Sequence, residues 1–467
     1  MSYRIVISGG VIVTETDQFR ADIVIDDERI AAIVADSDGI DGDEHLDATD
    51  LLILPGVIDT RVSFREPDAQ STEGYASGGR AAAAGGTTTV IDLPQGTPTA
   101  RAPQTLAAKQ QRIRQSAITD VALWAGIAGD DPDRQGATDF TALADRGIAG
   151  FTSTMSNIDA SLGAVSDAQL LGAMLAIAPL GIPYALHAEN DSLLQASLAM
   201  MDATGRGDVA AFGESRPPLV EIAAVNHALL LAEHTGCWVH IDHVSTPESL
   251  RLINEARARG VHVTVSISAH LLTLTEHDLE TLHGFGTSIP PLRSEEEVDA
   301  LWAFVLDETI DVICSDHIPV PTDRKRAGAQ DVFAAPPGLT GAQTLLPVIW
   351  DEAVVKRGVD PTQLVRMLST NAAQMFGFFP RKGTIRIGGD ADLVLFDPHA
   401  QWTIRNQDMH YRHAWTPFDG RTVTGVPLRT LRRGETIFDA EQHETPHPAA
   451  PGSGRFIPRN YATSNSR

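Results

Sequence analysis

The sequence predicts a mixed α/β protein, in which a (β/α)8 barrel of the TIM type is joined to a small β-sandwich. Two observations support this fold class. Strand-like and helix-like runs alternate through the middle of the chain, whereas both ends contain only short strand-like runs. Alternation of this kind is typical of a parallel sheet covered by helices. With 467 residues, 43% of them hydrophobic, the chain can bury a large barrel core and a second, smaller core.

Eight strand-like runs form the predicted barrel, and helical stretches separate most of them. In such a barrel the functional site lies at the carboxyl ends of the strands, so the polar residues that end each run are the candidates for chemistry. The predicted strands are residues 57–59, 87–93, 120–125, 150–154, 184–188, 237–244, 262–268 and 312–315. The predicted helices include residues 77–84, 170–178, 218–234 and 247–259.

The two ends of the chain share one pattern. Apolar and polar residues alternate between turn residues near the amino terminus, and the same pattern returns in the last quarter of the sequence. Two distant all-β segments around one α/β stretch predict a sandwich built from both ends. The expected domains are residues 1–52 and 379–445 for the sandwich and 53–378 for the barrel. A loosely ordered tail, rich in Pro, Gly, Ser and Asn, is expected at 446–467.

Composition narrows the class of partner. The chain has 36 basic and 61 acidic residues, a formal net charge of −25, which disfavours nucleic acid and anionic membranes as partners. Only two cysteines occur, Cys237 and Cys314, too few for a disulfide framework, so a reducing cytoplasm is expected. No apolar run approaches the length of a membrane span.

The stretch from Leu54 to Pro67 carries a resemblance to a known family. An apolar run meets Pro55-Gly56 and continues as Val-Ile-Asp-Thr-Arg-Val-Ser before a polar loop. It resembles the first barrel strand of the amidohydrolase superfamily, the group that includes allantoinases, dihydroorotases and hydantoinases. In that family the sequence motif of this strand is P-G-x-I-D-x-H-x-H. The resemblance implies that both histidines bind metal. Arg61 and Ser63 stand at those two positions here.

Three other strand ends match the family's metal-binding pattern. His187 lies in His-Ala-Glu-Asn, His243 in His-Ile-Asp-His, and Asp316 in Ser-Asp-His-Ile-Pro. The resemblance implies that all three bind metal and that Asp316 is also the catalytic group that accepts a proton from the attacking water. Each residue alone is more simply a hydrogen-bonded core histidine or a capping aspartate, but three at strand ends favour a site.

A further metal-contacting group of the family is replaced at Thr152. The segment Gly150-Phe151-Thr152 resembles a G-F-K segment whose lysine is carbamylated and bridges two metals. With Arg61, Ser63 and Thr152, three of six metal-contacting groups are missing, so we expect at most one divalent ion, Zn²⁺ being the candidate, or none. The permanent positive charge of Arg61 must pair with Asp316 or with substrate, because an unpaired buried charge is costly.

Other residues match substrate-side segments of the family. Arg65 resembles an arginine that binds the substrate carboxylate in dihydroorotases, with a surface ion pair as the equal alternative. Gln95 follows the second strand, Ser288 begins Ser-Ile-Pro-Pro-Leu-Arg, and Pro337-Gly338 resembles the loop that closes the pocket. The resemblance covers about residues 5–460 and is closest to bacterial allantoinases.

Three functional hypotheses follow. The first is an allantoinase-like hydrolase that opens a small cyclic amide or ureide ring with an atypical metal site. The second is a non-catalytic paralogue that acts as a binding or structural subunit. The third is a metal-independent enzyme on a related ring that uses Arg61. The resemblance also implies a homo-oligomer, a dimer or a tetramer.

Overall fold

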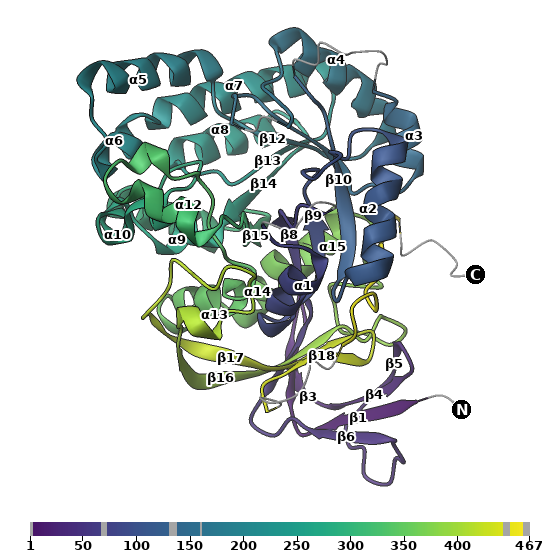
Figure 1. Cartoon of the computed structure of the whole chain (residues 1–467). Helices are drawn as coiled ribbons and strands as arrows, with labels where there is room; N and C mark the ends of the chain where they lie inside the picture. The colour runs from purple at the N-terminus through teal and green to yellow at the C-terminus, as the bar shows by residue number, and fades with distance from the viewer. Residues whose placement is uncertain (1–2, 67–71, 130–137, 159–160, 442–448, 461–467) are drawn as a thin grey trace.

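The structure is a computed structural model of the chain and describes residues 3–66, 72–129, 138–158, 161–441 and 449–460. Figure 1 shows two layers of organisation: a barrel surrounded by helices above, and strands from both ends of the chain below. The predicted fold class is therefore confirmed.

Eight parallel strands form the barrel, in the order in which they occur in the chain. β8, β9 and β10 are buried along their whole length, as expected of strands covered on both faces. A bridge between Val62 and His317 and a 2.8 Å hydrogen bond from the Ser63 amide to the His317 carbonyl join the last strand to the first. The strands are β8 (Val57–Val62), β9 (Thr87–Asp92), β10 (Asp120–Gly126), β11 (Gly150–Thr154), β12 (Tyr184–His187), β13 (Val239–Ile241), β14 (Val263–Ser268) and β15 (Val312–Cys314).

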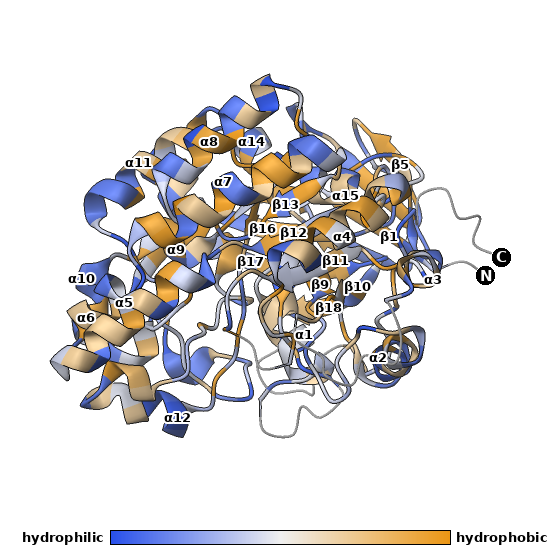
Figure 2. Cartoon of the chain, turned by 90° about the horizontal axis from the view of Figure 1, so that it is seen from above, coloured by the Kyte–Doolittle hydropathy of each residue, from blue (hydrophilic) through white to orange (hydrophobic). Residues whose placement is uncertain are grey.

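Helices cover the barrel from outside. In Figure 2 the barrel strands β12 and β13 are hydrophobic, and the peripheral helices α10 and α12 are largely hydrophilic. The helices are α1 (Tyr75–Ala84), α2 (Pro103–Ser116), α3 (Phe140–Asp145), α4 (Asp167–Ile177), α5 (Asp191–Thr204), α6 (Val209–Glu214), α7 (Pro218–Thr235), α8 (Pro247–Ala258), α9 (Ala269–Thr273), α10 (Glu276–Leu282), α11 (Glu295–Leu306), α12 (Thr322–Arg326), α13 (Leu345–Trp350), α14 (Pro361–Val365) and α15 (Asn371–Met375).

Short 3-10 or π turns connect several of these helices. They are η2 (Ala178–Leu180), η3 (His283–Gly286), η4 (Ala327–Ala329), η5 (Val332–Ala334), η6 (Asp351–Val355), η7 (Arg366–Thr370) and η8 (Asn406–Asp408). Within the described ranges, no helix is both long enough and apolar enough to cross a membrane.

Strands from both ends of the chain share one sheet, as predicted. That six-stranded sheet has the order β18-β17-β16-β7-β2-β3, and a four-stranded sheet, β5-β4-β1-β6, packs with it around an apolar core of isoleucines and leucines. The strands are β1 (Arg4–Ser8), β2 (Val11–Val13), β3 (Gln18–Arg20), β4 (Asp22–Asp26), β5 (Arg29–Val34), β6 (Glu44–Asp47), β7 (Leu52–Pro55), β16 (Leu393–Thr403), β17 (Thr422–Arg432) and β18 (Glu435–Asp439).

The sandwich and the barrel join at Gly56. β7 ends at Pro55 in the six-stranded sheet, and β8 starts at Val57 in the barrel. A Cβ atom at Gly56 would lie 2.2 Å from the Thr88 hydroxyl oxygen, so only glycine fits between the two strands. The expected domain boundary at residue 53 therefore falls inside β7.

The expectation of a loosely ordered tail is wrong for residues 449–460. Arg455 and Ile457 pair with Val121 at the start of β10, with N–O distances of 2.8 and 2.9 Å, and the side chain of Ile457 is buried. The backbone of this polar segment satisfies hydrogen-bonding groups at the start of β10. The amino-acid composition of the segment does not predict such backbone contacts. The rest of the expected tail lies outside the described residues.

Candidate active site

The candidate active site lies at the carboxyl ends of the barrel strands. Arg61 lies near the end of β8, His187 ends β12, and His243 and Asp316 follow β13 and β15 by two residues. All four residues are buried, at most 9% exposed. Parallel strands therefore bring together residues that are separated by as many as 255 positions in the sequence.

Arg61 is held between two carboxylates. Its Nε donates to Asp316 Oδ1 at 2.8 Å, and its Nη1 donates to Asp242 Oδ2. The predicted pairing of Arg61 with Asp316 is confirmed. Burial alone would lower the pKa of Arg61, but the two carboxylates outweigh it and raise the pKa, so the guanidinium stays charged.

The two histidines contact each other rather than Arg61. His187 Nδ1 lies 3.0 Å from His243 Nε2, and His187 Nε2 lies 2.8 Å from Glu189 Oε2. Arg216 Nη1 donates to the same glutamate oxygen at 2.5 Å. Burial raises the pKa of Glu189, but the hydrogen bonds and charges of His187 and Arg216 outweigh it and hold the pKa at about 2. Glu189 is therefore an anion that orients His187.

The backbone is strained at two of these residues. His243 has φ of 38° and Asp316 has φ of 48°, in the left-handed region that residues with a Cβ rarely adopt. Such strain persists only where the surrounding structure holds it, and it concentrates at functional sites. The positive φ re-aims each side chain after its strand has ended.

The residues present do not fit a bound metal ion in this arrangement. A catalytic zinc site takes three protein ligands, and the two paired histidines supply two nitrogens. Asp316, the expected third ligand, is paired with Arg61 instead. Across the described ranges no group of three His, Cys, Asp or Glu side chains is arranged to hold a metal. The expected ligand set of His187, His243 and Asp316 is thus not assembled, because the Arg61 cation takes the aspartate.

The expected substrate residues lie on four loops. Arg65 and Gln95, both half-buried, lie just after β8 and β9. Ser288 follows η3, and its hydroxyl donates to the Pro290 carbonyl at 2.8 Å. Pro337 and Gly338 follow η5, and the Gly338 amide donates to the Thr287 carbonyl at 2.9 Å, so these last two loops are neighbours.

Three members of the charged site are not predicted from the sequence. Asp242 and Glu189 stand next to predicted residues, in His-Ile-Asp-His and His-Ala-Glu-Asn, and an unexplained acid beside a strand end was the available signal. Arg216 follows α6 in the sequence Glu-Ser-Arg-Pro, far from any predicted strand, and no local pattern marks it.

Comparison with known proteins identifies the family. The amidohydrolase family model matches residues 52–437, so the chain belongs to the amidohydrolase family, whose members generally use divalent metal ions. Within that family the chain is similar to the allantoinase of Rubrobacter xylanophilus, with 39% identity over 94% of this chain and 95% of that protein. It is also 32% identical to the Escherichia coli allantoinase, over 98% of this chain and 99% of that one.

Solved structures show the same fold. The L-hydantoinase (dihydropyrimidinase) from Arthrobacter aurescens superposes with a TM-score of 0.92 and 30% identity, covering 98% of this chain and all of that one. The dihydropyrimidinase from Brevibacillus agri superposes with a TM-score of 0.89 and 28% identity, covering 98% and 99% of the two chains. The barrel and the sheet domain thus extend through the whole chain in both comparisons.

Proposed function

We propose that this protein hydrolyses a ring amide of a small cyclic ureide, such as allantoin or a hydantoin. The observation that carries the proposal is the contact of Arg61 with Asp316 at the mouth of an amidohydrolase barrel. The similarity to allantoinases and hydantoinases over nearly the whole chain supports the class of substrate.

In the proposed reaction Asp316 is the general base. Its carboxylate accepts a proton as the oxygen of a water molecule attacks the ring carbonyl carbon. The carbonyl oxygen gains negative charge, which the Arg61 guanidinium stabilises through Nη2, because Nε and Nη1 are engaged by the two carboxylates. The C–N bond then breaks, the proton passes from Asp316 to the ring nitrogen, and the opened product carries a carboxylic acid.

An Asp316→Asn variant tests this role. Loss of a general base typically lowers the rate by about 10²–10⁴-fold. We expect that loss of ring opening in a protein whose circular dichroism at the assay temperature matches the parent's. Asp323→Asn, an exposed residue on α12 beyond the same strand, is the matched control and should turn over normally. A parent-like rate in the Asp316→Asn variant would contradict the assignment.

The metal content is proposed to be at most one divalent ion per chain. The expectation rests on Arg61, Ser63 and Thr152, because none of these side chains supplies the histidine or carbamate ligands of a two-metal site. Elemental analysis of the purified protein should give one ion or fewer, and two tightly held ions would contradict it. If an ion does serve the reaction, a chelator should abolish turnover and added ion should restore it.

A second candidate is a non-catalytic paralogue that binds a ring compound or a partner subunit. The absence of a three-ligand group across the described residues favours it. It predicts no turnover of allantoin, hydantoin, dihydroorotate or dihydropyrimidines, with or without added zinc. That result would overturn the hydrolase proposal.

Two broader expectations belong to the same proposal. A homo-oligomer, either a dimer or a tetramer, is expected from the family resemblance, and light scattering on the purified protein tests it. A cytoplasmic location is expected from the two buried free cysteines, and fractionation of the source cells tests it.

A further inference from the structure

Lys325 is a buried cation on an otherwise exposed short helix. It lies on α12, between Arg324 and Arg326, whose side chains are exposed, while Lys325 itself is fully buried. Long charged side chains are rarely buried unless their heads have partners. The partners of this ammonium therefore indicate what it does.

Three oxygen atoms and one aromatic ring surround the ammonium. Lys325 Nζ donates to the Thr287 carbonyl at 3.1 Å, to the Thr287 hydroxyl at 3.0 Å and to the Pro336 carbonyl at 3.1 Å. It also lies 5.5 Å from the centre of the Trp415 ring. Neutral dipoles and a π face fill the donor capacity of an ammonium, but none of these partners neutralises its charge.

These contacts join the loops that carry the expected substrate residues. Thr287 directly precedes Ser288, and Pro336 directly precedes Pro337 and Gly338. The Gly338 amide donates to the same Thr287 carbonyl that Lys325 binds, and Gly338 has φ of +134°, which a residue with a Cβ cannot adopt without strain. The Thr287 carbonyl thus connects both loops: it accepts one hydrogen bond from the Gly338 amide and a second from Lys325.

Packing alone does not require a charged group here. Met fills a similar volume and would contact Trp415 without the desolvation cost of an ammonium. Burial lowers the pKa of Lys325 well below its ordinary value, which agrees with an environment that has no neutralising acid. The hydrogen-bonding head of Lys325 is therefore explained by its contacts to the two loops, whose geometry it fixes.

We propose that Lys325 is a positioning residue that holds the Ser288 loop and the Pro337–Gly338 loop at one separation and so sets the affinity for the substrate ring. The proposal rests on the proposed function for its substrate. It adds a residue on α12, outside the charged centre, to the determinants of specificity.

Lys325→Met tests the proposal through steady-state kinetics on the ureide that the parent turns over. KM should rise about tenfold, the size of one lost hydrogen bond in binding, while kcat stays near the parent's value. Arg324→Met, on the same helix but exposed, is the matched control and should change neither constant. An unchanged KM in a folded Lys325→Met variant would overturn the proposal, as would a loss confined to kcat.

Hydrogen–deuterium exchange gives a readout that does not depend on turnover. Peptides that cover residues 283–290 and 334–341 should both exchange faster in Lys325→Met, while peptides from the sandwich stay unchanged. Exchange that is unchanged in both loops would overturn the positioning role even if the parent lacks activity. If Lys325→Met fails to fold, Lys325→Gln, which keeps a donor, is measured in its place with the same two outcomes.

Discussion

Asp59 is a buried carboxyl group two residues before Arg61 on β8. Its Oδ1 accepts hydrogen bonds from the Ser315 amide at 3.1 Å and the Arg61 amide at 3.4 Å. No hydrogen-bond partner reaches its buried Oδ2 in the described part of the chain. Burial is the largest influence and raises the pKa of Asp59 to about 6, although these hydrogen bonds oppose it.

This pKa predicts that Asp59→Asn stabilises the protein near neutral pH. The folded-state pKa of about 6 exceeds the reference value of 3.8, so the folded state binds the proton more tightly than the unfolded state. The parent should therefore lose stability as pH rises from about 4 to 6, and the variant should not. The difference in the free energy of unfolding above pH 6 should approach about 3 kcal/mol.

Urea unfolding at pH 4 and pH 7 measures the difference. The two proteins should be close in stability at pH 4 and diverge by pH 7. A variant that is less stable than the parent at pH 7 would show that the charged carboxylate is needed to hold the Ser315 amide.

At the scale of single residues, the need to pair a buried charge predicted one contact of the site, that between Arg61 and Asp316. Arg61 could be assigned to Asp316 from sequence, because a buried guanidinium needs an acid and a strand end supplied one. Asp242 was not foreseen as its second partner, since which of two neighbouring strand-end residues faces Arg61 depends on the backbone. In this arrangement Asp316 pairs with Arg61, and its expected role as a metal ligand stays a prediction.

At the level of elements, the carboxyl-terminal residues 449–460, called the strap below, pack along the outside of the barrel. The Gly452 and Gly454 amides both donate to the Ala117 carbonyl at 2.9 Å, and Ile457 packs among buried residues beside Trp124 and Phe378. These contacts cover the amino-terminal end of β10, which would otherwise expose backbone groups.

Ile457→Ala should therefore lower the free energy of unfolding by about 3 kcal/mol, within the range for a buried aliphatic side chain cut to alanine. Met200→Ala on α5 is the control, because Met200 is 66% exposed and its truncation should leave stability unchanged. Chemical denaturation compares the two. Equal, small effects would mean that the strap is held by its backbone alone.

The sequence predicts which segments form barrel strands, but it does not predict where each strand ends. The predicted strand 237–244 is only Val239–Ile241 in the structure. The prediction was too long because Cys237 and Trp238 before the strand and Val244 after it are apolar, and the left-handed φ of His243 turns the chain out of the sheet. The tail was misjudged for the opposite reason, because its order comes from backbone hydrogen bonds that polar composition does not reveal.

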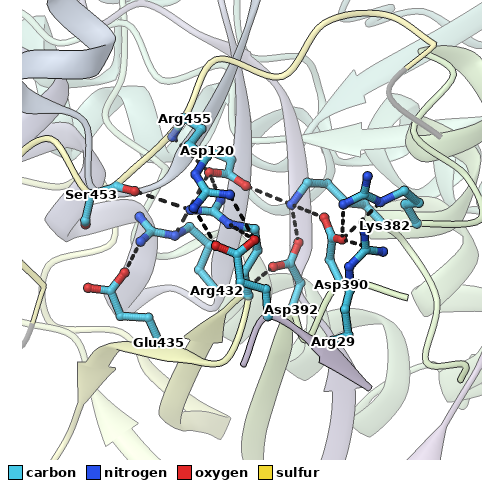
Figure 3. Close-up of polar contacts among 12 residues, drawn as sticks. Arg29, Asp120, Lys382, Asp390, Asp392, Arg432, Glu435, Ser453 and Arg455 are labelled. Atoms are coloured by element: carbon cyan, nitrogen blue, oxygen red, sulfur yellow. Dashed lines mark hydrogen bonds and ion pairs between the residues drawn. The ribbon is translucent and has the colours of Figure 1, made fainter. Parts of the chain in front are cut away.

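At the scale of the whole molecule, a buried ion cluster joins the barrel to the sandwich (Figure 3). Lys382 Nζ lies 2.8 Å from Asp120 of β10, 2.6 Å from Asp392 and 3.3 Å from Asp390. Arg433 also donates to Asp120 from the turn after β17. The residues come from four separate segments, and Lys382, Asp120 and Asp390 are fully inaccessible.

Charge complementarity fixes how the two domains meet. Burial lowers the pKa of Lys382, but the three aspartates outweigh it and raise the pKa above its ordinary value. Burial likewise raises the pKa of Asp120, and Lys382 with Arg433 and Arg432 outweighs it and lowers the pKa far below the usual range. The cluster was not foreseen from sequence, because its members lie as many as 313 positions apart and no local pattern links them.

Lys382→Met should therefore destabilise the protein strongly. Removing one partner of a buried charge cluster leaves uncompensated carboxylates, and breaking such a cluster typically costs about 3–5 kcal/mol. Lys356→Met is the matched control: its ion pairs with Asp351 and Glu352 are 47% exposed on the lysine side, so its loss should cost about 1 kcal/mol or less. Urea unfolding in low salt and in 0.5 M NaCl, on the order of a 4 Å Debye length, separates the two, because salt screens exposed pairs and not buried ones. The cost of Lys382→Met should be the same in both solutions. A cost that disappears in salt would mean that water reaches the cluster and that the domains are joined by packing instead.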